Sequence, residues 1–243
     1  SNWWDGAHQP SYDSVMQVLH EHNVWQDTRL QKQLQLLRVV GVKHPRGGSP
    51  LNEMLLKKLV METLPTIFLE VGAFRGTTSI RVAELFDETP LLKNSFVLSM
   101  DTWLFDLRFV WNKQVRKIKA SYFRGNAELS GSSQMYFNFL ANVIASGLAH
   151  RIIPMQTASQ NGAMALLANK IRPELIYVDA SHSNPDVFID YENFYSILAP
   201  GGVMAFDDVA NVPAVRAALD ALVARYSLRA IINGNQAYIQ KPR

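Results

Sequence analysis

The chain contains no cysteine, and this absence removes whole classes of site. None of its 243 residues is Cys, so disulfide bonds and thiolate metal sites are excluded and a reducing compartment is expected. No apolar run approaches the roughly 20 residues that span a membrane. No basic segment followed by an apolar one opens the chain, so we expect no secretion signal. We therefore expect a cytoplasmic protein with no membrane partner.

Charge is also sparse. The net charge is +3 and charged residues make up 19% of the chain, whereas a nucleic-acid binder usually carries a more concentrated basic face. We therefore expect no nucleic-acid partner. Apolar residues make up 48%, which argues against general disorder. The length is sufficient for one large α/β domain with a sizeable core.

Residues 1–62 read as mostly helical. Apolar residues recur at helical spacing in TRLQKQLQLLRVV, and a Ser-Pro pair precedes the helical pattern of LNEMLLKKLVMETL. We expect this segment to form a helical cover or lid on a second unit, residues 63–243.

From residue 63 onward, strand-like segments alternate with helical ones. The strand-like segments are TIFLEV, SFVLSM, RIIPM, ELIYVD, GVMAFDD, LRAIIN and QAYIQK. Strands that alternate with helices predict a Rossmann-like, doubly wound α/β fold, with a mainly parallel sheet covered on both faces. The last two strands are joined by Gly234-Asn235, which predicts a terminal hairpin and one antiparallel strand.

Carboxylates stand at the ends of most of the predicted central strands. The first strand delivers Glu70, the second Asp101, the fourth Asp179, and the fifth Asp207 and Asp208. In open parallel sheets, ligands bind outside the carboxyl ends of the strands, and acids buried there must be paired, hydrated or bound to metal. The competing interpretation is that each acid caps the helix that follows it.

The turn after the first strand reads EVGAFRG, and it is neither a dinucleotide fingerprint nor a phosphate-binding loop. Gly72 and Gly76 permit a tight turn and a close approach of a ligand to the backbone. A phosphate would favour cations there, whereas Glu70 favours a positively charged ligand. Asp101 lies about where an acid would meet a ribose hydroxyl pair. S-adenosylmethionine is a cationic nucleoside with a free ribose.

Two segments, EVGAFRG and VLSMDTW, resemble the first motifs of class I S-adenosylmethionine-dependent methyltransferases. The run ELIYVDASHSNPDVFIDYENFYSILAPGGVMAFDD resembles later motifs of small-molecule O-methyltransferases related to macrocin and catechol O-methyltransferases. The resemblance covers residues 66–208. It implies a seven-stranded sheet in the order 3-2-1-4-5-7-6, with the last strand antiparallel.

The resemblance also implies a set of S-adenosylmethionine contacts. The matching residues are Glu70, Gly72, Gly76, Asp101, Thr102, Trp103, Ser159, Gln160 and Asp179. Ser159 and Gln160 match a Ser-Gln pair that contacts adenine in the catechol group. A plain helix cap by Ser159 is the competing interpretation.

The resemblance to the catechol group further implies a divalent cation, Mg²⁺ above all, held by Asp179, Asp207 and Asp208. Such a cation would lower the pKa of an acceptor hydroxyl and align it with the methyl group. His182 lies three residues after Asp179, so we expect this pair to be catalytic, with His182 as general base. His182 could equally be a metal ligand, a cofactor contact, or a side chain that only hydrogen-bonds the loop. The local sequence DASHS departs from both related groups.

A long excursion, residues 102–147, separates the second strand from the third. We expect a helical insertion that forms an acceptor pocket or lid, because long aromatic insertions near strand ends often do so. A helical subdomain with its own core is the alternative. The excursion is basic between Arg108 and Arg124, which could attract an anionic acceptor or an acyl carrier protein, or could be a solvated face.

The sequence thus predicts a methyltransferase that acts on a hydroxyl of a small natural product, sugar or polyketide-type intermediate. Alternatives are an N-methyltransferase, a cephalosporin-hydroxylase-like enzyme, an RNA methyltransferase, or a non-catalytic module with the same fold. A non-catalytic module would be expected to have lost Glu70, Gly72 or Asp101, and all three residues are present. A homodimer is a further expectation.

Overall fold

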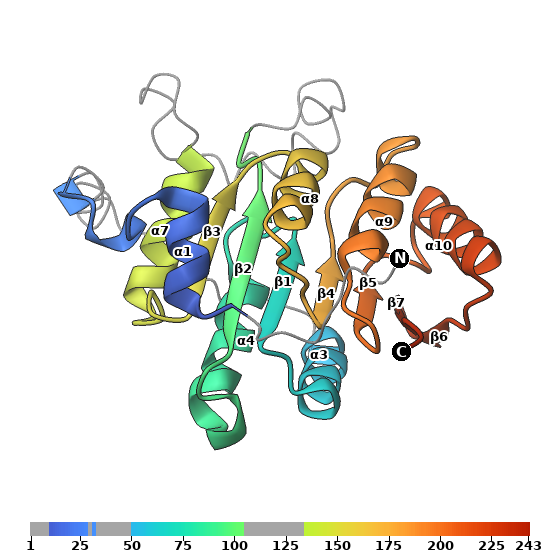
Figure 1. Cartoon of the computed structure of the whole chain (residues 1–243). Coiled ribbons are helices and arrows are strands. Elements are labelled where there is room, and N and C mark those ends of the chain that lie inside the picture. Colours follow the sequence, from blue (N-terminus) through green and yellow to red (C-terminus); the bar gives the residue numbers. More distant parts are fainter. Residues whose placement is uncertain (1–9, 29–30, 33–49, 105–133) are drawn as a thin grey trace.

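The computed structural model describes residues 10–28, 31–32, 50–104 and 134–243 of the chain. They form one seven-stranded sheet between helices on both faces (Figure 1). The strands are β1 (Ile67–Val71), β2 (Phe96–Asp101), β3 (Ile152–Gln156), β4 (Leu175–Val178), β5 (Val203–Phe206), β6 (Ile231–Asn233) and β7 (Gln236–Gln240). The helices are α1 (Tyr12–His20), α3 (Pro50–Thr63), α4 (Thr77–Glu88), α7 (Gln134–Ala145), α8 (Ser159–Ala168), α9 (Asp186–Ile197) and α10 (Pro213–Tyr226), with short 3-10 turns η1 (Val24–Gln26) and η2 (Pro90–Leu92).

The strand order is β3-β2-β1-β4-β5-β7-β6. Strands β1 to β5 run parallel, and β7 runs antiparallel to both β5 and β6. The predicted sheet order and terminal hairpin are therefore confirmed. The chain moves outward from β1 to β3 and then returns to β4, which pairs with β1 on its other side. Such a reversal opens a crevice above the carboxyl ends of β1 and β4.

The central strands are buried along their whole length. Every residue of β1, β4 and β5 is buried, as expected for parallel strands covered on both faces. Helices α8, α9 and α10 pack in a row, and α3 packs on α4; Figure 1 shows α8 and α9 on the side of the sheet that faces the viewer. The core is thus continuous from the sheet into both helical layers.

Helices α3 and α7 both contribute to this core. Leu59 and Val60 of α3 and Phe139 and Val143 of α7 are fully buried in it. The last part of the predicted insertion, α7, is thus a crossover helix between β2 and β3. Residues 105–133 of the insertion, which include the whole basic run, lie outside the described residues. So do residues 1–9, 29–30 and 33–49 of the predicted N-terminal cover.

Among the helices that the structure describes, none is both long and apolar enough to cross a membrane.

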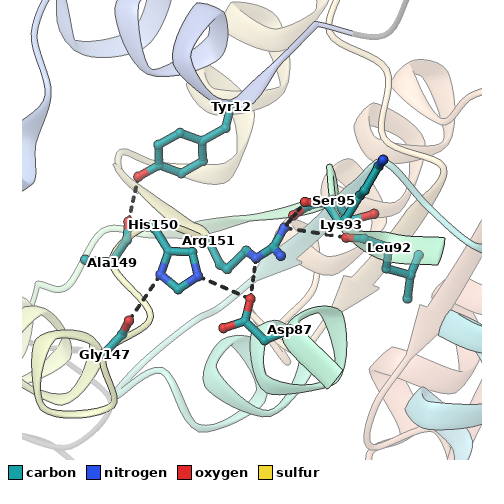
Figure 2. Close-up of polar contacts among 9 residues, drawn as sticks. All are labelled: Tyr12, Asp87, Leu92, Lys93, Ser95, Gly147, Ala149, His150 and Arg151. Atoms are coloured by element: carbon teal, nitrogen blue, oxygen red, sulfur yellow. Dashed lines mark hydrogen bonds and ion pairs between the residues drawn. The ribbon is translucent and has the colours of Figure 1, made fainter. Parts of the chain in front are cut away.

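At the amino edge of the sheet, the side chain of one arginine before β3 hydrogen-bonds both the end of α4 and the loop that enters β2 (Figure 2). Arg151, just before β3, donates from Nε to Asp87 Oδ1 at 2.6 Å, at the end of α4. Its Nη1 donates to the carbonyl oxygens of Lys93 at 2.6 Å and Ser95 at 2.9 Å. Because these carbonyls belong to the loop that enters β2, Arg151 fixes the loop between α4 and β2 against the start of β3.

The neighbouring contacts at this edge are more exposed. His150 Nε2 lies 3.2 Å from the same Asp87 oxygen, but the His150 side chain is 58% exposed, compared with 14% for Arg151. Tyr12 of α1 donates its hydroxyl to the carbonyl oxygen of Ala149 at 2.6 Å. This bond connects α1 to the segment just before β3. Burial raises the pKa of the Tyr12 hydroxyl to about 12.

We predict that Arg151→Ala lowers the free energy of unfolding by about 1–3 kcal/mol, because it leaves the partly buried Ser95 carbonyl oxygen without this donor and removes the contact with Asp87. His150→Ala is the matched control, and its exposed contact predicts a change of less than about 1 kcal/mol. Urea unfolding of both variants measures the difference. Equal losses of unfolding free energy in the two variants would show that Arg151 contributes no more to this edge than the exposed His150 does.

Candidate functional site

The candidate site lies at the carboxyl edge of the sheet, where β2, β1, β4 and β5 end side by side. A cavity of about 430 Å³ opens there. From the sheet it is lined by Glu70, Gly72, Tyr177, Asp179 and Asp207, and from the helical layer by residues of α3 and α4. The carboxylates that the sequence placed at separate strand ends therefore come to one edge.

The glycine turn after β1 is confined between β4 and α7. Gly72 has φ +94°, and a Cβ added there would lie 2.0 Å from the backbone oxygen of Asp179. Gly76 has φ +84°, and its Cβ would lie 2.9 Å from the Phe139 ring. Both positions thus combine a left-handed backbone with a close neighbour, and glycine alone satisfies both conditions.

The carboxylate of Asp101 holds this turn from the side of β2. Its Oδ2 accepts from the backbone N–H of Phe74 at 2.8 Å, and its Oδ1 accepts from the N–H of Trp103 at 2.8 Å. Burial raises the pKa of Asp101, although these hydrogen bonds oppose that rise. A carboxylate offers about four acceptor positions, so Asp101 could also accept a hydrogen bond from a ligand hydroxyl.

Trp103 is part of the support for this turn. Its indole Nε1 donates to the Phe74 carbonyl at 2.6 Å, and its buried ring packs against Tyr136 and Phe139 of α7, with centroids 4.7 Å and 4.6 Å away. The structure thus directs the ring of this predicted cofactor contact into the core. Thr102, the neighbouring predicted contact, accepts from the N–H of Leu104 at 3.2 Å.

Glu70 is buried at the end of β1. The hydroxyl of Ser79, in the first turns of α4, donates to Glu70 Oε2, and Ser79 lies 2.6 Å from the Ser99 hydroxyl of β2. Burial raises the pKa of Glu70 to about 8, against the opposing effect of the Ser79 hydrogen bond. Glu70 thus holds its proton more tightly than an ordinary carboxyl group, and a cationic ligand in the cavity would favour its ionised form.

Ser159 and Gln160 begin α8, next to the end of β3. The N-cap of α8 is Ala158, and no side chain caps the helix, so the alternative prediction that Ser159 is a helix cap is wrong. Instead the Ser159 hydroxyl donates to Asp190 of α9 at 2.5 Å. Asp190 is buried, and this raises its pKa to about 6. The Gln160 side chain is exposed.

Two acids and a histidine converge beyond β4 and β5. His182 Nε2 lies 3.2 Å from Asp208 Oδ2 and 3.6 Å from Asp179 Oδ1. One ligand atom from each of the three residues lies within 4.8 Å of the others. This group could hold a cation between the carboxylates.

Asp207 has a different environment from its neighbour. Its Oδ2 accepts from the Tyr177 hydroxyl at 2.7 Å, and its Oδ1 accepts from the backbone N–H of Asp208 at 2.9 Å. Burial, and then the charge of Asp179, raise the pKa of Asp207. Of the three predicted metal ligands, the structure thus brings Asp179 and Asp208 together with His182 and directs Asp207 toward Tyr177.

Several residues that support the site were not identified from the sequence. They are Ser79, Tyr177, Asp190, Asn235 and Gln236. The signal that could have singled out Tyr177 and Asp190 is a polar group inside an otherwise apolar buried pattern.

Comparisons with known proteins agree with this geometry. Residues 69–209 match a family described as a methyltransferase domain. A search of curated proteins found no match. Among solved structures, the fold is similar to the O-methyltransferase from Bacillus cereus in complex with SAH, at 14% identity and a TM-score of 0.52, covering 93% of this chain and 97% of that one.

Two further solved structures have similar folds. CalS11, described as a TDP-rhamnose 3'-O-methyltransferase, is 14% identical with a TM-score of 0.53, covering 98% of both chains. The O-methyltransferase NovP is 15% identical with a TM-score of 0.54, covering 79% of this chain and 80% of that one. At these identities the likeness concerns the fold.

We predict that Glu70→Gln flattens the dependence of stability on pH. Between pH 4.5, the usual pKa of the group, and about pH 8, native Glu70 keeps a proton that the unfolded chain releases. Its contribution to stability is therefore full below that window and is lost across it, by about 1.4 kcal/mol per pH unit. Gln cannot ionise, so the variant should lose this decline.

Urea unfolding from pH 5 to pH 8 tests this prediction. Glu62→Gln is the matched control, because it makes the same change at an exposed side chain of α3. Parallel pH profiles for wild type and Glu70→Gln would contradict the raised pKa.

Proposed function

The chain belongs to the methyltransferase-domain family, as the sequence predicted, and we propose that it transfers a methyl group from S-adenosylmethionine to a hydroxyl oxygen of a small acceptor. The observation that carries this proposal is the position of three groups at one sheet edge: the glycine turn, Asp101, and the Asp179–His182–Asp208 group. They supply, in that order, a close backbone approach, an acceptor for ribose hydroxyls, and a place to activate an oxygen nucleophile.

At the cofactor end, the residues bind and orient. Phe74 and Trp103 fix both oxygens of Asp101, so the carboxylate is oriented before a ligand arrives, and such preorganisation favours binding. Gly72 leaves the β1 turn without a side chain where the cavity opens. Glu70 provides a buried acid that a sulfonium or ammonium group would stabilise in its charged form.

At the acceptor end, we assign proton transfer to His182. The acceptor hydroxyl gives its proton to the His182 imidazole while its oxygen attacks the methyl carbon and the carbon–sulfur bond breaks. The sulfur leaves neutral, so the products are a methyl ether and S-adenosylhomocysteine. Asp208 at 3.2 Å and Asp179 at 3.6 Å stabilise the imidazolium that forms.

The donor set fits a divalent cation. Carboxylate oxygens of Asp179 and Asp208 lie close enough to reach one ion, and Mg²⁺ in such sites takes one or two carboxylates with water and substrate oxygens. When bound, such a cation would supply Lewis-acid stabilisation of the charge that develops on the acceptor. The residues that would hold it are Asp179 and Asp208, with His182 beside them as the base.

The acceptor class that we propose is a hydroxyl on a small natural product, sugar or polyketide-type intermediate, which a carrier protein could present. Support comes from a fold neighbour that is described as a TDP-rhamnose 3'-O-methyltransferase. A cytoplasmic homodimer completes the proposal.

We predict that S-adenosylmethionine and S-adenosylhomocysteine bind with micromolar affinity and that Asp101→Ala weakens both by at least about tenfold, since it removes a charged hydrogen-bond acceptor. Isothermal titration calorimetry measures the change. Asp220→Ala on α10 is the control, because it removes an exposed acid and should leave both affinities unchanged. A folded wild type that binds neither nucleoside would contradict the proposed function.

We predict that Asp179→Asn weakens Mn²⁺ binding by at least about tenfold, whereas His182→Gln changes it by less than about threefold but abolishes methyl transfer. Titration of Mn²⁺ followed by electron paramagnetic resonance measures the affinity without turnover. Equal losses in the two variants would make His182 a ligand rather than the base. An equal loss in Asp207→Asn would return Asp207 to the ligand set expected from the sequence.

A further inference from the structure

The turn of the terminal hairpin contacts the acid pair after β5. Gly234 and Asn235 join β6 to β7, and the backbone N–H of Val209 donates to the Asn235 carbonyl at 2.8 Å. The side-chain Oδ1 of Asn235 accepts from the N–H groups of Ala210 and Asn211, both at 3.1 Å. The end of the chain thus forms one side of the loop that carries Asp207 and Asp208.

Asn235 also binds the side chain of Asp208. Its Nδ2 donates to Asp208 Oδ1 at 2.8 Å, while the other oxygen, Oδ2, lies 3.2 Å from His182 Nε2. One oxygen is thus held by the hairpin and the second faces the candidate site. Because an amide N–H donates and cannot accept, Asn235 favours the orientation in which a carboxylate oxygen points at it.

The neighbouring acid is held by a separate set of residues. Buried Gln236 donates from Nε2 to the Tyr177 hydroxyl at 2.9 Å, and that hydroxyl donates to Asp207 Oδ2 at 2.7 Å. Asp208 has φ +58°, so the backbone turns sharply at the second acid. Consecutive hairpin residues therefore fix consecutive acids in different environments, Asp208 directly and Asp207 through Tyr177.

We propose that Asn235 is a positioning residue of the site, which holds Asp208 so that its free oxygen faces His182 and Asp179. This inference rests on the proposed function for the role of that group, but the orientation of Asp208 can be tested separately. Outer hydrogen-bond partners of metal-binding carboxylates typically change metal affinity by roughly 10–100-fold when removed. The terminal hairpin thereby contributes a supporting residue to a site whose other residues follow the parallel strands.

The test uses crystal structures and Mn²⁺ titrations of the full chain with Asn235→Ala. We expect the Asp208 carboxylate to leave its position beside His182, Mn²⁺ affinity to fall about tenfold, and S-adenosylhomocysteine affinity to remain within about twofold. Asn233→Ala is the matched control, because it removes an exposed amide from the same hairpin and should reproduce the wild type in all three measurements.

A second variant separates the contact with Asp208 from the stability of the turn. Asn235→Asp keeps an acceptor for the N–H groups of Ala210 and Asn211 but replaces the donor to Asp208 with a second carboxylate. We expect Asp208 to be displaced in its crystal structure as well.

An Asp208 carboxylate that stays in place in both variants would overturn the proposal, and so would an Asn235→Ala variant that loses nucleoside and metal binding equally, because the role would then be structural. If wild type binds the nucleoside but no Mn²⁺, the proposed cation fails, and the position of Asp208 in the two variants decides the inference. If wild type binds neither, the proposed function fails, and the same crystal structures still decide the orientation.

Discussion

The turn between β1 and α4 has no room for a side chain at Gly72, and the arrangement of the site depends on this constraint. The backbone oxygen of Asp179 occupies the position that a Cβ at Gly72 would need. The end of β4 can therefore come directly against the turn after β1, which places the acid of β4 beside the cavity. Any larger residue at Gly72 would separate β1 from β4 at the point where the chain reverses direction, and the crevice at that point is where ligands bind in such sheets.

Three buried or half-buried carboxylates are each paired by a hydroxyl from another helix or strand. Glu70 is bound by Ser79, Asp190 by Ser159, and Asp207 by Tyr177. A buried carboxylate is costly unless it is protonated or hydrogen-bonded, and the raised pKa values of all three acids follow from burial. The site is thus preorganised by hydrogen bonds that also give it a pH dependence.

Much of the fold was predictable from the sequence, because the spacing of apolar residues along a segment shows which of its residues are buried. The alternation of strands and helices predicted a parallel sheet, and the resemblance gave the strand order. The Gly234-Asn235 turn predicted the terminal hairpin. Strand ends also predicted which acids reach the carboxyl edge, since a residue at the end of a parallel strand has few other places to lie.

Side-chain directions were not predictable in the same way. Asp207 and Asp208 are neighbours in sequence, yet Tyr177 binds one and Asn235 the other, from 30 and 27 residues away. The competing interpretation of Ser159 as a helix cap rested on a local pattern, whereas its hydrogen-bond partner, Asp190, lies 31 residues away on α9. Trp103 follows Asp101 closely, but the packing of α7 directs its ring into the core. Each of these outcomes depends on contacts that exist only after the sheet has formed.

The most direct test of the central claim is a crystal structure of the wild-type protein with S-adenosylhomocysteine and Mn²⁺, in which anomalous scattering locates the metal. The account predicts that the ribose hydroxyls contact Asp101, that the homocysteine end lies along the Gly72 turn, and that the metal lies between Asp179 and Asp208. A nucleoside bound away from the carboxyl edge, or a metal held by Asp207 without Asp208, would contradict it.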